Sequence, residues 1–165
     1  MSSYIWLDCR SDDTPELLAL RLKHMVAMGR PMVVLCIGTP AIPGDSLGPA
    51  VGSLLSHDKS LHVYGTMEAP VHALNLKATL KDIRRQFRKP MIIVVDAALG
   101  NEYQNGFLAI KKGALRPGSG LGKRLPSIGD IQITGVFCSL YGHGVMEQMQ
   151  RYSWCIANGL AAFYE

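Results

Sequence analysis

The chain has 165 residues and a mass of 18.0 kDa, a size that suits one folded domain. Hydrophobic residues make up 48% and charged residues 18%, a balance that excludes an intrinsically disordered chain. The longest apolar runs are far shorter than the roughly 20 residues that span a bilayer, and the first residues lack the basic start of a secretory signal. We therefore expect a single cytoplasmic domain over residues 1–165, with no membrane partner.

Basic residues give the chain a net charge of +4 and gather in two stretches, residues 81–89 and 111–124. Modest patches of this kind are more often a solvated helix face or a soluble loop than a binding surface. The more specific interpretation is a binding surface for an acidic partner. Phe87 is the one aromatic residue in these stretches, which disfavours a nucleic-acid partner.

Four cysteines occur, at positions 9, 36, 138 and 155, and no two of them form a Cys-x-x-Cys pair. Their spacing excludes a zinc ribbon and a thioredoxin motif. Most of them lie in apolar segments, where a free thiol behaves as a small hydrophobic group. The pattern indicates a reduced, cytosolic protein.

The first predicted helix covers residues 14–28, within an N-terminal extension over 1–30. Thr14 can cap it, and Pro15 suits the first helical position. The apolar run over 32–37 follows, bounded by proline and glycine, and predicts a strand that is buried on both faces.

Strand-like and helix-like segments then alternate to the end of the chain. The predicted elements are a helix over 46–56, a strand over 61–64, a helix over 70–86, strands over 91–95, 107–110 and 131–137, and a helix over 144–163. This alternation predicts a three-layer α/β/α fold with a mostly parallel central sheet of about five strands. No helix intervenes within 92–110, so one strand is expected to be antiparallel.

Ligand sites in such sheets form beyond the carboxyl ends of the strands. Asp96 ends the apolar run 91–95, and Asp45 follows the first buried strand at the start of a helix. Each carboxylate also has a purely structural interpretation, as the cap of a turn or of a helix. If their strands are neighbours, however, the two loops emerge about 4.8 Å apart. Two carboxylates at that range can share a proton or a metal ion.

The segment from Gly44 to Gly48 matches the Gly-x-Ser-x-Gly pattern of serine hydrolases. Ser46, Asp96 and His143 also follow the chain order of a hydrolase triad. The nucleophile serine of that fold stands directly after a strand, whereas here a loop with two prolines intervenes. A serine esterase is therefore the least favoured of the functions considered.

A glycine-rich stretch over 117–124 resembles a phosphate loop but lacks the first glycine and the final serine or threonine of that motif. We expect a mobile loop over a site instead. Among the five histidines, His72 is the best candidate for the same cleft, because it lies beyond the end of a predicted strand. A structural histidine is the commoner alternative.

Several motifs together resemble those of the YyaC-type sporulation proteins. They are Cys36–Thr39 with Gly44–Pro49, Tyr64–Leu76, Val95–Gly100, and Pro117–Lys123 with Leu125–Asp130. The resemblance covers roughly residues 31–160 and keeps the order of the motifs. That family is similar to the spore germination protease and, more distantly, to the hydrogenase maturation endopeptidases.

The resemblance implies the α/β/α fold of these proteases and a place in the cytoplasm of the forming spore or the mother cell. The two aspartates held to be catalytic in the germination protease map onto Asp45 and Asp96. The same positions bind metal in the hydrogenase endopeptidases, together with a late histidine that has no clear counterpart between Gly113 and Asp130. We therefore expect no cofactor; a divalent metal, if bound, would be held by Asp45, Asp96 and His72.

The hypothesis from the sequence is a sporulation-associated peptidase of the germination-protease class, which hydrolyses peptide bonds with an aspartate pair. Asp45 and Asp96 would activate a water molecule, with an acidic protein as the suspected substrate. The expected supporting residues are Ser46, Glu68 and His72, and the expected substrate-binding loop residues are Gly118, Gly120, Gly122 and Lys123. The alternative is a catalytically inactive sporulation binding protein that keeps the pocket, and the oligomeric state is left open.

Overall fold

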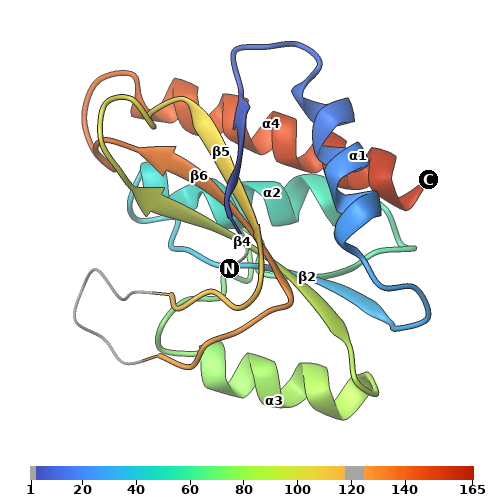
Figure 1. The fold of residues 1–165 in the computed structure, drawn as a ribbon. Helices are drawn as coiled ribbons and strands as arrows, with labels where there is room; N and C mark the ends of the chain where they lie inside the picture. The colour runs from blue at the N-terminus through green and yellow to red at the C-terminus, as the bar shows by residue number, and fades with distance from the viewer. Residues whose placement is uncertain (1–2, 118–124) are drawn as a thin grey trace.

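A computed structural model describes residues 3–117 and 125–165 of the chain (Figure 1). Strands and helices alternate along most of it. The elements are β1 (Ile5–Asp8), α1 (Thr14–Met25), β2 (Met32–Cys36), the 3-10 helix η1 (Gly44–Ser46), α2 (Leu47–Leu55), β3 (His62–Tyr64), α3 (Leu76–Gln86), β4 (Met91–Leu99), β5 (Phe107–Lys112), β6 (Ile131–Phe137) and α4 (Val145–Tyr164). No helix in the described ranges combines the length and the apolar character needed to cross a membrane.

The described strands form one six-stranded sheet in the order β1-β5-β6-β4-β2-β3. Strands β3, β2, β4 and β6 run parallel to one another, while β5 runs antiparallel to β6 and to β1. Residues 32–36 pair with residues 91–95, so the expected neighbours are confirmed. The expected antiparallel strand within 92–110 is also confirmed, as β5.

Helices cover both faces of the sheet, so the three-layer α/β/α fold is confirmed (Figure 1). Along β4, Ile93 and Val95 pack into the core under α1, α2 and α4, whereas Ile92 and Val94 pack against α3. Successive side chains of a strand point to opposite faces, and both faces here are apolar. That is why the run over 91–95 is continuously hydrophobic.

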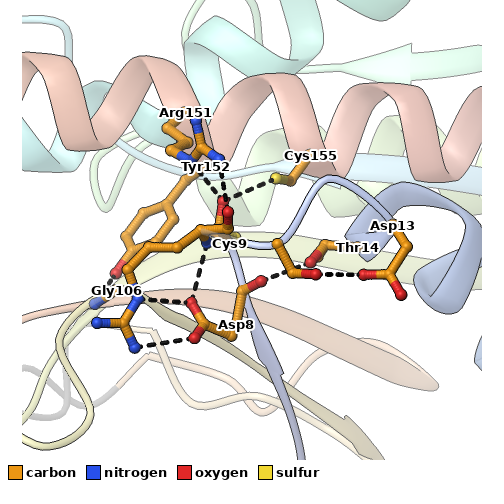
Figure 2. A network of polar contacts seen from close by, with 10 residues as sticks. Asp8, Cys9, Asp13, Thr14, Gly106, Arg151, Tyr152 and Cys155 are labelled. Atoms are coloured by element: carbon orange, nitrogen blue, oxygen red, sulfur yellow. Dashed lines mark hydrogen bonds and ion pairs between the residues drawn. The ribbon is translucent and has the colours of Figure 1, made fainter.

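The N-terminal segment is part of the sheet, which the sequence analysis missed. Strand β1 pairs with β5 at the edge of the sheet, with Leu7 buried opposite Leu108. Figure 2 shows how the end of β1 is held: the Arg151 guanidinium of α4 donates hydrogen bonds to the carbonyl oxygens of Cys9 and Arg10. A four-residue strand with an exposed tryptophan gives too short a pattern for sequence analysis to detect.

Helix α3 begins at Leu76, whereas the sequence predicted a helix from residue 70. The Asn75 side chain explains the delay. Its oxygen accepts a hydrogen bond from the His72 amide (2.8 Å), and its nitrogen donates one to the Pro70 carbonyl (2.9 Å). These bonds hold a turn in place of the first helical turn. Val71 is left free to bridge Ile37 beside the sheet.

Candidate active site

The strand order places the topological switch point of the sheet at the carboxyl ends of β2 and β4, because the chain leaves β2 toward β3 and returns on the other side of β2 as β4. Ligand sites of open α/β sheets form at such switch points. The amide of Ile37 still donates to the Val95 carbonyl (2.8 Å), but the amide of Gly38 donates to Val71 instead (2.9 Å). The chain after β2 therefore stops pairing with β4, which continues to Leu99 paired with β6 only.

Asp45 lies in η1, at this switch point. A Cβ atom at position 38 would lie 2.0 Å from the Asp45 carbonyl oxygen, so only glycine lets the chain pass there. The Gly44 amide donates to the Leu140 carbonyl (2.9 Å), which ties η1 to the loop after β6. Oδ2 of the half-buried Asp45 accepts a hydrogen bond from the Thr39 amide (2.8 Å).

Asp96 lies in β4, one residue beyond the last residue that pairs with β2. It is only 8% exposed, and its Oδ1 accepts a hydrogen bond from the amide of Ala97 (2.8 Å). By the alternation along β4 its side chain points to the α3 side of the sheet. The end of the region paired with β2 thus leaves a buried carboxyl group at the switch point.

Burial raises the pKa of Asp96 well above its usual value, and the negative charge of Asp45 raises it further; the Ala97 amide opposes them. Burial also raises the pKa of Asp45, against the opposing effect of the Thr39 amide. Two carboxyl groups whose charges act on each other do not both ionise easily. The arrangement favours a proton on Asp96 and a charge on the less buried Asp45. The two carboxyl groups then differ in protonation, as an acid and a base that act on each other through their charges.

Ser46 is 3% exposed, and its hydroxyl donates a hydrogen bond to the Pro43 carbonyl (2.5 Å). This contact holds the η1 turn. A nucleophile elbow needs an exposed hydroxyl directly after a strand. Ser46 instead lies inside a 3-10 helix and is separated from β2 by a loop, and His143 lies exposed in the loop after β6. This arrangement does not fit a serine esterase.

His72 and Glu68 both lie in the connection between β3 and α3. The Nδ1 atom of His72 accepts a hydrogen bond from the Leu74 amide (3.2 Å), and its side chain lines a groove of about 630 Å³ with Asn75 and Asp82. Glu68 is exposed on the preceding turn. Within the described part of the chain, no hydrogen bond or ion pair joins either side chain to the two aspartates. Their supporting role stays a prediction.

The donor set for a metal ion is incomplete. In residues 3–117 and 125–165, no group of three or more His, Cys, Asp or Glu side chains is placed to hold one. Asp45 and Asp96 offer oxygen atoms, and His72 is not grouped with them. The substrate-loop residues Gly118, Gly120, Gly122 and Lys123 lie outside the described residues. The two ends of their loop are joined by a bridge between Leu115 and Ile128, which packs in the core with α3.

Exposed apolar side chains at the carboxyl ends of β4 and β6 were not expected from the sequence. Leu99 is 66% exposed at the end of β4, Tyr103 is 91% exposed in the turn after it, and Tyr141 is 60% exposed in the loop after β6. The signal in the sequence that could have revealed them is an apolar or aromatic residue at the end of β4 and in the loops that follow β4 and β6. Large exposed apolar groups gathered at one edge indicate a binding surface.

Comparison with known proteins gives three findings. The family model described as "Protein of unknown function (DUF1256)" matches residues 10–152. "Uncharacterized protein YyaC" of Bacillus subtilis (strain 168) is 46% identical over 112 residues, which are 67% of this chain and 55% of that protein. The chain thus matches about half the length of this curated relative.

The crystal structure of the [NiFe] hydrogenase maturation protease HycI from Thermococcus kodakarensis KOD1 aligns with 88% of this chain and 99% of its own, with 14% identity and a TM-score of 0.48. The family match spans most of the chain, from Arg10 before α1 to Tyr152 in α4, and includes both aspartates. The chain therefore belongs to the DUF1256 family, which includes sequences of the YyaC type.

Proposed function

We propose that this protein is a peptidase in which Asp45 acts as the general base and Asp96 as the general acid. The observation that carries the proposal is the buried Asp96 carboxyl, whose pKa is raised by burial and by Asp45 at the carboxyl ends of adjacent strands. Paired carboxyl groups with different environments are the arrangement that divides acid and base work between two identical side chains. The resemblance of the motifs to the spore germination protease supports a peptide bond as the target.

The hydrogen bonds support a different role for each carboxyl oxygen. Thr39 occupies Oδ2 of Asp45, so Oδ1 takes the proton of the attacking water. The amide of Ala97 occupies Oδ1 of Asp96, so Oδ2 carries the proton that is donated to the substrate carbonyl oxygen. The water oxygen bonds to the carbonyl carbon, and the C–N bond then breaks as the proton on Asp45 passes to the leaving amine. The oxygen proton returns to Asp96, and the pair is restored.

We further propose an acidic protein as the substrate and a sporulating cell as the place of action. The basic stretch over 81–89 and the basic residues Lys111 and Arg116 support an acidic protein as the substrate. The resemblance of the motifs to sporulation proteins supports a role in the cytoplasm of the forming spore or the mother cell.

The test is digestion of a mixed peptide library by the purified protein, with cleavage read by mass spectrometry. We expect cleavage by the wild type and a loss of about 10²–10⁴ in rate for Asp45→Asn and for Asp96→Asn. The double variant should be no worse than either single variant, because the two groups act as a unit. Asp58→Asn is the matched control, since Asp58 is exposed and bonds only to Ser60 nearby. Equal rates in all four variants and the wild type would refute the proposal.

A non-catalytic binding protein is the second candidate, and the exposed apolar side chains of Leu99, Tyr103 and Tyr141 favour it. Binding of peptides to these side chains without cleavage at any pH would favour the binding protein over the peptidase. A serine hydrolase would instead be labelled at Ser46 by a fluorophosphonate probe. We expect no labelling, since the Ser46 hydroxyl is buried against Pro43.

A further inference from the structure

Strand β4 has an open edge next to the aspartates. Its backbone groups alternate in direction: Met91 donates to Pro31 and Val95 accepts from Ile37, both on the β2 side, whereas Gly100 donates to Phe137 on the β6 side. By this alternation Ala97 and Leu99 also face the β2 side. Strand β2 has already ended at Cys36.

The backbone groups at this edge are largely unpaired. The Ala97 amide is taken by the Asp96 carboxylate, but within the described residues no hydrogen bond outside the sheet involves the Ala97 carbonyl or either backbone group of Leu99. The β2–β4 pairing itself stops at Val95. The exposure of Leu99 agrees with an uncovered edge. Unpaired strand edges are templates for pairing with another chain.

The loops that carry the apolar side chains described above are tied together at the carboxyl ends of β4 and β6. The Gly100 amide donates to the Phe137 carbonyl (2.9 Å), which joins the ends of β4 and β6. The Asn105 side-chain oxygen accepts from the Cys138 amide (3.0 Å) and from Gln148 of α4 (3.1 Å), which holds the turn that bears Tyr103 on the β6 side of β4. The bond from the Gly44 amide to the Leu140 carbonyl brings the loop that bears Tyr141 to the Asp45 turn, next to the open edge.

We propose that an extended peptide adds to β4 as a further strand, pairing with the Ala97 carbonyl and with the backbone groups of Leu99, and that Leu99 and Tyr141 contact its apolar or aromatic side chains. This inference rests on the proposed function, for which it names the substrate class. A row of alternating amide and carbonyl groups is matched by another peptide backbone. Because Ala97 follows Asp96 directly, a peptide at this edge passes its carbonyl groups within one or two strand rises of about 3.3 Å from the carboxyl.

A second copy of this chain is the competing occupant, and the length of the edge argues against it. Only residues 96–99 of β4 extend past the last pair with β2, and the end of β2 and the Asp45 turn border them on one side. So short an edge has room for a single strand. It does not offer the broad surface that a stable dimer buries.

The test measures binding on the Asp45→Asn protein, so that cleavage does not interfere. The probe is a fluorescein-labelled peptide of alternating phenylalanine and threonine, read by fluorescence anisotropy. N-methyl groups on one alternate set of amides should weaken binding about tenfold or more, and on the other set much less, because only one set faces β4. Equal effects of the two methylation patterns, or no binding of the parent peptide, would overturn the inference.

Variants of the edge give the second arm. Leu99→Ala removes the side-chain contact, and Leu99→Pro also removes the amide that faces the open edge while it leaves the bonds to β6 in place. We expect Leu99→Pro to bind about tenfold more weakly than Leu99→Ala, with unchanged melting temperatures. Leu74→Ala is the control, because Leu74 is 90% exposed but belongs to the β3–α3 connection. Equal binding by the two Leu99 variants would overturn the pairing.

The two proposals fail in distinguishable ways. If the probe binds with the alternating methylation pattern but the wild type cleaves no peptide, the edge inference stands and the peptidase proposal falls. If the wild type cleaves peptides and none shows the alternating pattern, the peptidase stands and the edge inference falls. A concentration-dependent dimer that Leu99→Pro dissolves would assign the edge to a second copy and also overturn the inference.

Discussion

Asp96 makes the stability of the protein depend on pH in a direction opposite to that of most carboxylates. Its pKa is raised above 3.8 in the folded state, so the folded chain holds a proton that the unfolded chain releases. The stabilisation is complete below pH 3.8 and is lost as the pH rises through the raised pKa. Asp96→Asn cannot ionise, and its amide oxygen can still accept from Ala97. We expect it to melt higher than the wild type at neutral pH, with the difference vanishing below pH 3.8.

The check is thermal denaturation across the pH range, with Asp58→Asn as the contrast. Hydrogen bonds from Ser60 lower the pKa of Asp58, so its contribution is present above pH 3.8 and is lost on acidification. At neutral pH the melting temperature of Asp96→Asn should therefore lie above that of the wild type, and the melting temperature of Asp58→Asn should lie below it. An Asp96→Asn curve that runs parallel to the wild type at all pH values would show that Asp96 is not a destabilising buried charge.

Tyr152 joins α4 to the sheet through one buried hydroxyl group. The hydroxyl donates to the Val136 carbonyl and accepts from the Gly106 amide (2.6 Å) and from Gln148 (3.0 Å). Tyr152→Phe leaves two buried backbone groups unpaired. We expect a loss of about 1–3 kcal/mol of unfolding free energy, or about 2–4 °C in Tm for each kcal/mol. Circular dichroism melting checks this, and Tyr103→Phe, at an exposed position, should melt as the wild type does.

The two aspartates could be identified from the sequence because each follows an apolar run that could only be a buried strand. The structural role of Ser46 could not be, because it depends on the turn that η1 makes toward Pro43. The exposure of Tyr103 and Tyr141 could not be predicted either, since exposure of an aromatic residue is a property of the folded surface. Residue type alone did not distinguish them from core residues.

Helix α2 lies so close to the sheet that glycine is required on its inner face. A Cβ atom at position 52 would lie 1.7 Å from the carbonyl oxygen of Gly65, and one at position 48 would lie 2.1 Å from that of Ile37. Backbone atoms cannot move aside as a side chain can. We expect Gly52→Ala to lose about 1–3 kcal/mol or more, measured by urea denaturation. Leu54→Ala, on the exposed side of the same helix, should lose little, and equal midpoints for both would contradict the close packing.

The long strands and helices were predictable, and so was the short strand β3, whereas the short strand β1 was not. Strands β2, β4 and β6 are continuous apolar runs, and α4 has a long helical pattern, so their existence followed from the sequence. The extension of β4 to Leu99 did not, because residues 96–99 are paired only through β6. Such tertiary pairing leaves no local signal in the sequence.

At the scale of the whole molecule, α4 holds the first and last segments of the chain together. Arg151 bonds the carbonyl groups of Cys9 and Arg10, as Figure 2 shows. Arg151→Lys keeps the charge but loses the forked donor. We expect faster amide hydrogen exchange at residues 5–10, measured by mass spectrometry, with little change in β4. Arg21→Lys is the exposed control, and unchanged exchange in the Arg151 variant would show that β1 is held by β5 alone.

The position of β1 has a consequence for the order in which the protein folds during synthesis. Strands β2, β3 and β4 can pair as soon as β4 has left the ribosome, because each needs only the others. Strand β1 is made before these strands, but its partner is β5, and Arg151, which bonds the Cys9 carbonyl, follows 142 residues later in the chain. A growing chain therefore carries β1, with Trp6 and Leu7, unpaired until β5 has been made. Closure of the sheet at β1 has to wait for two partners that lie far along the chain.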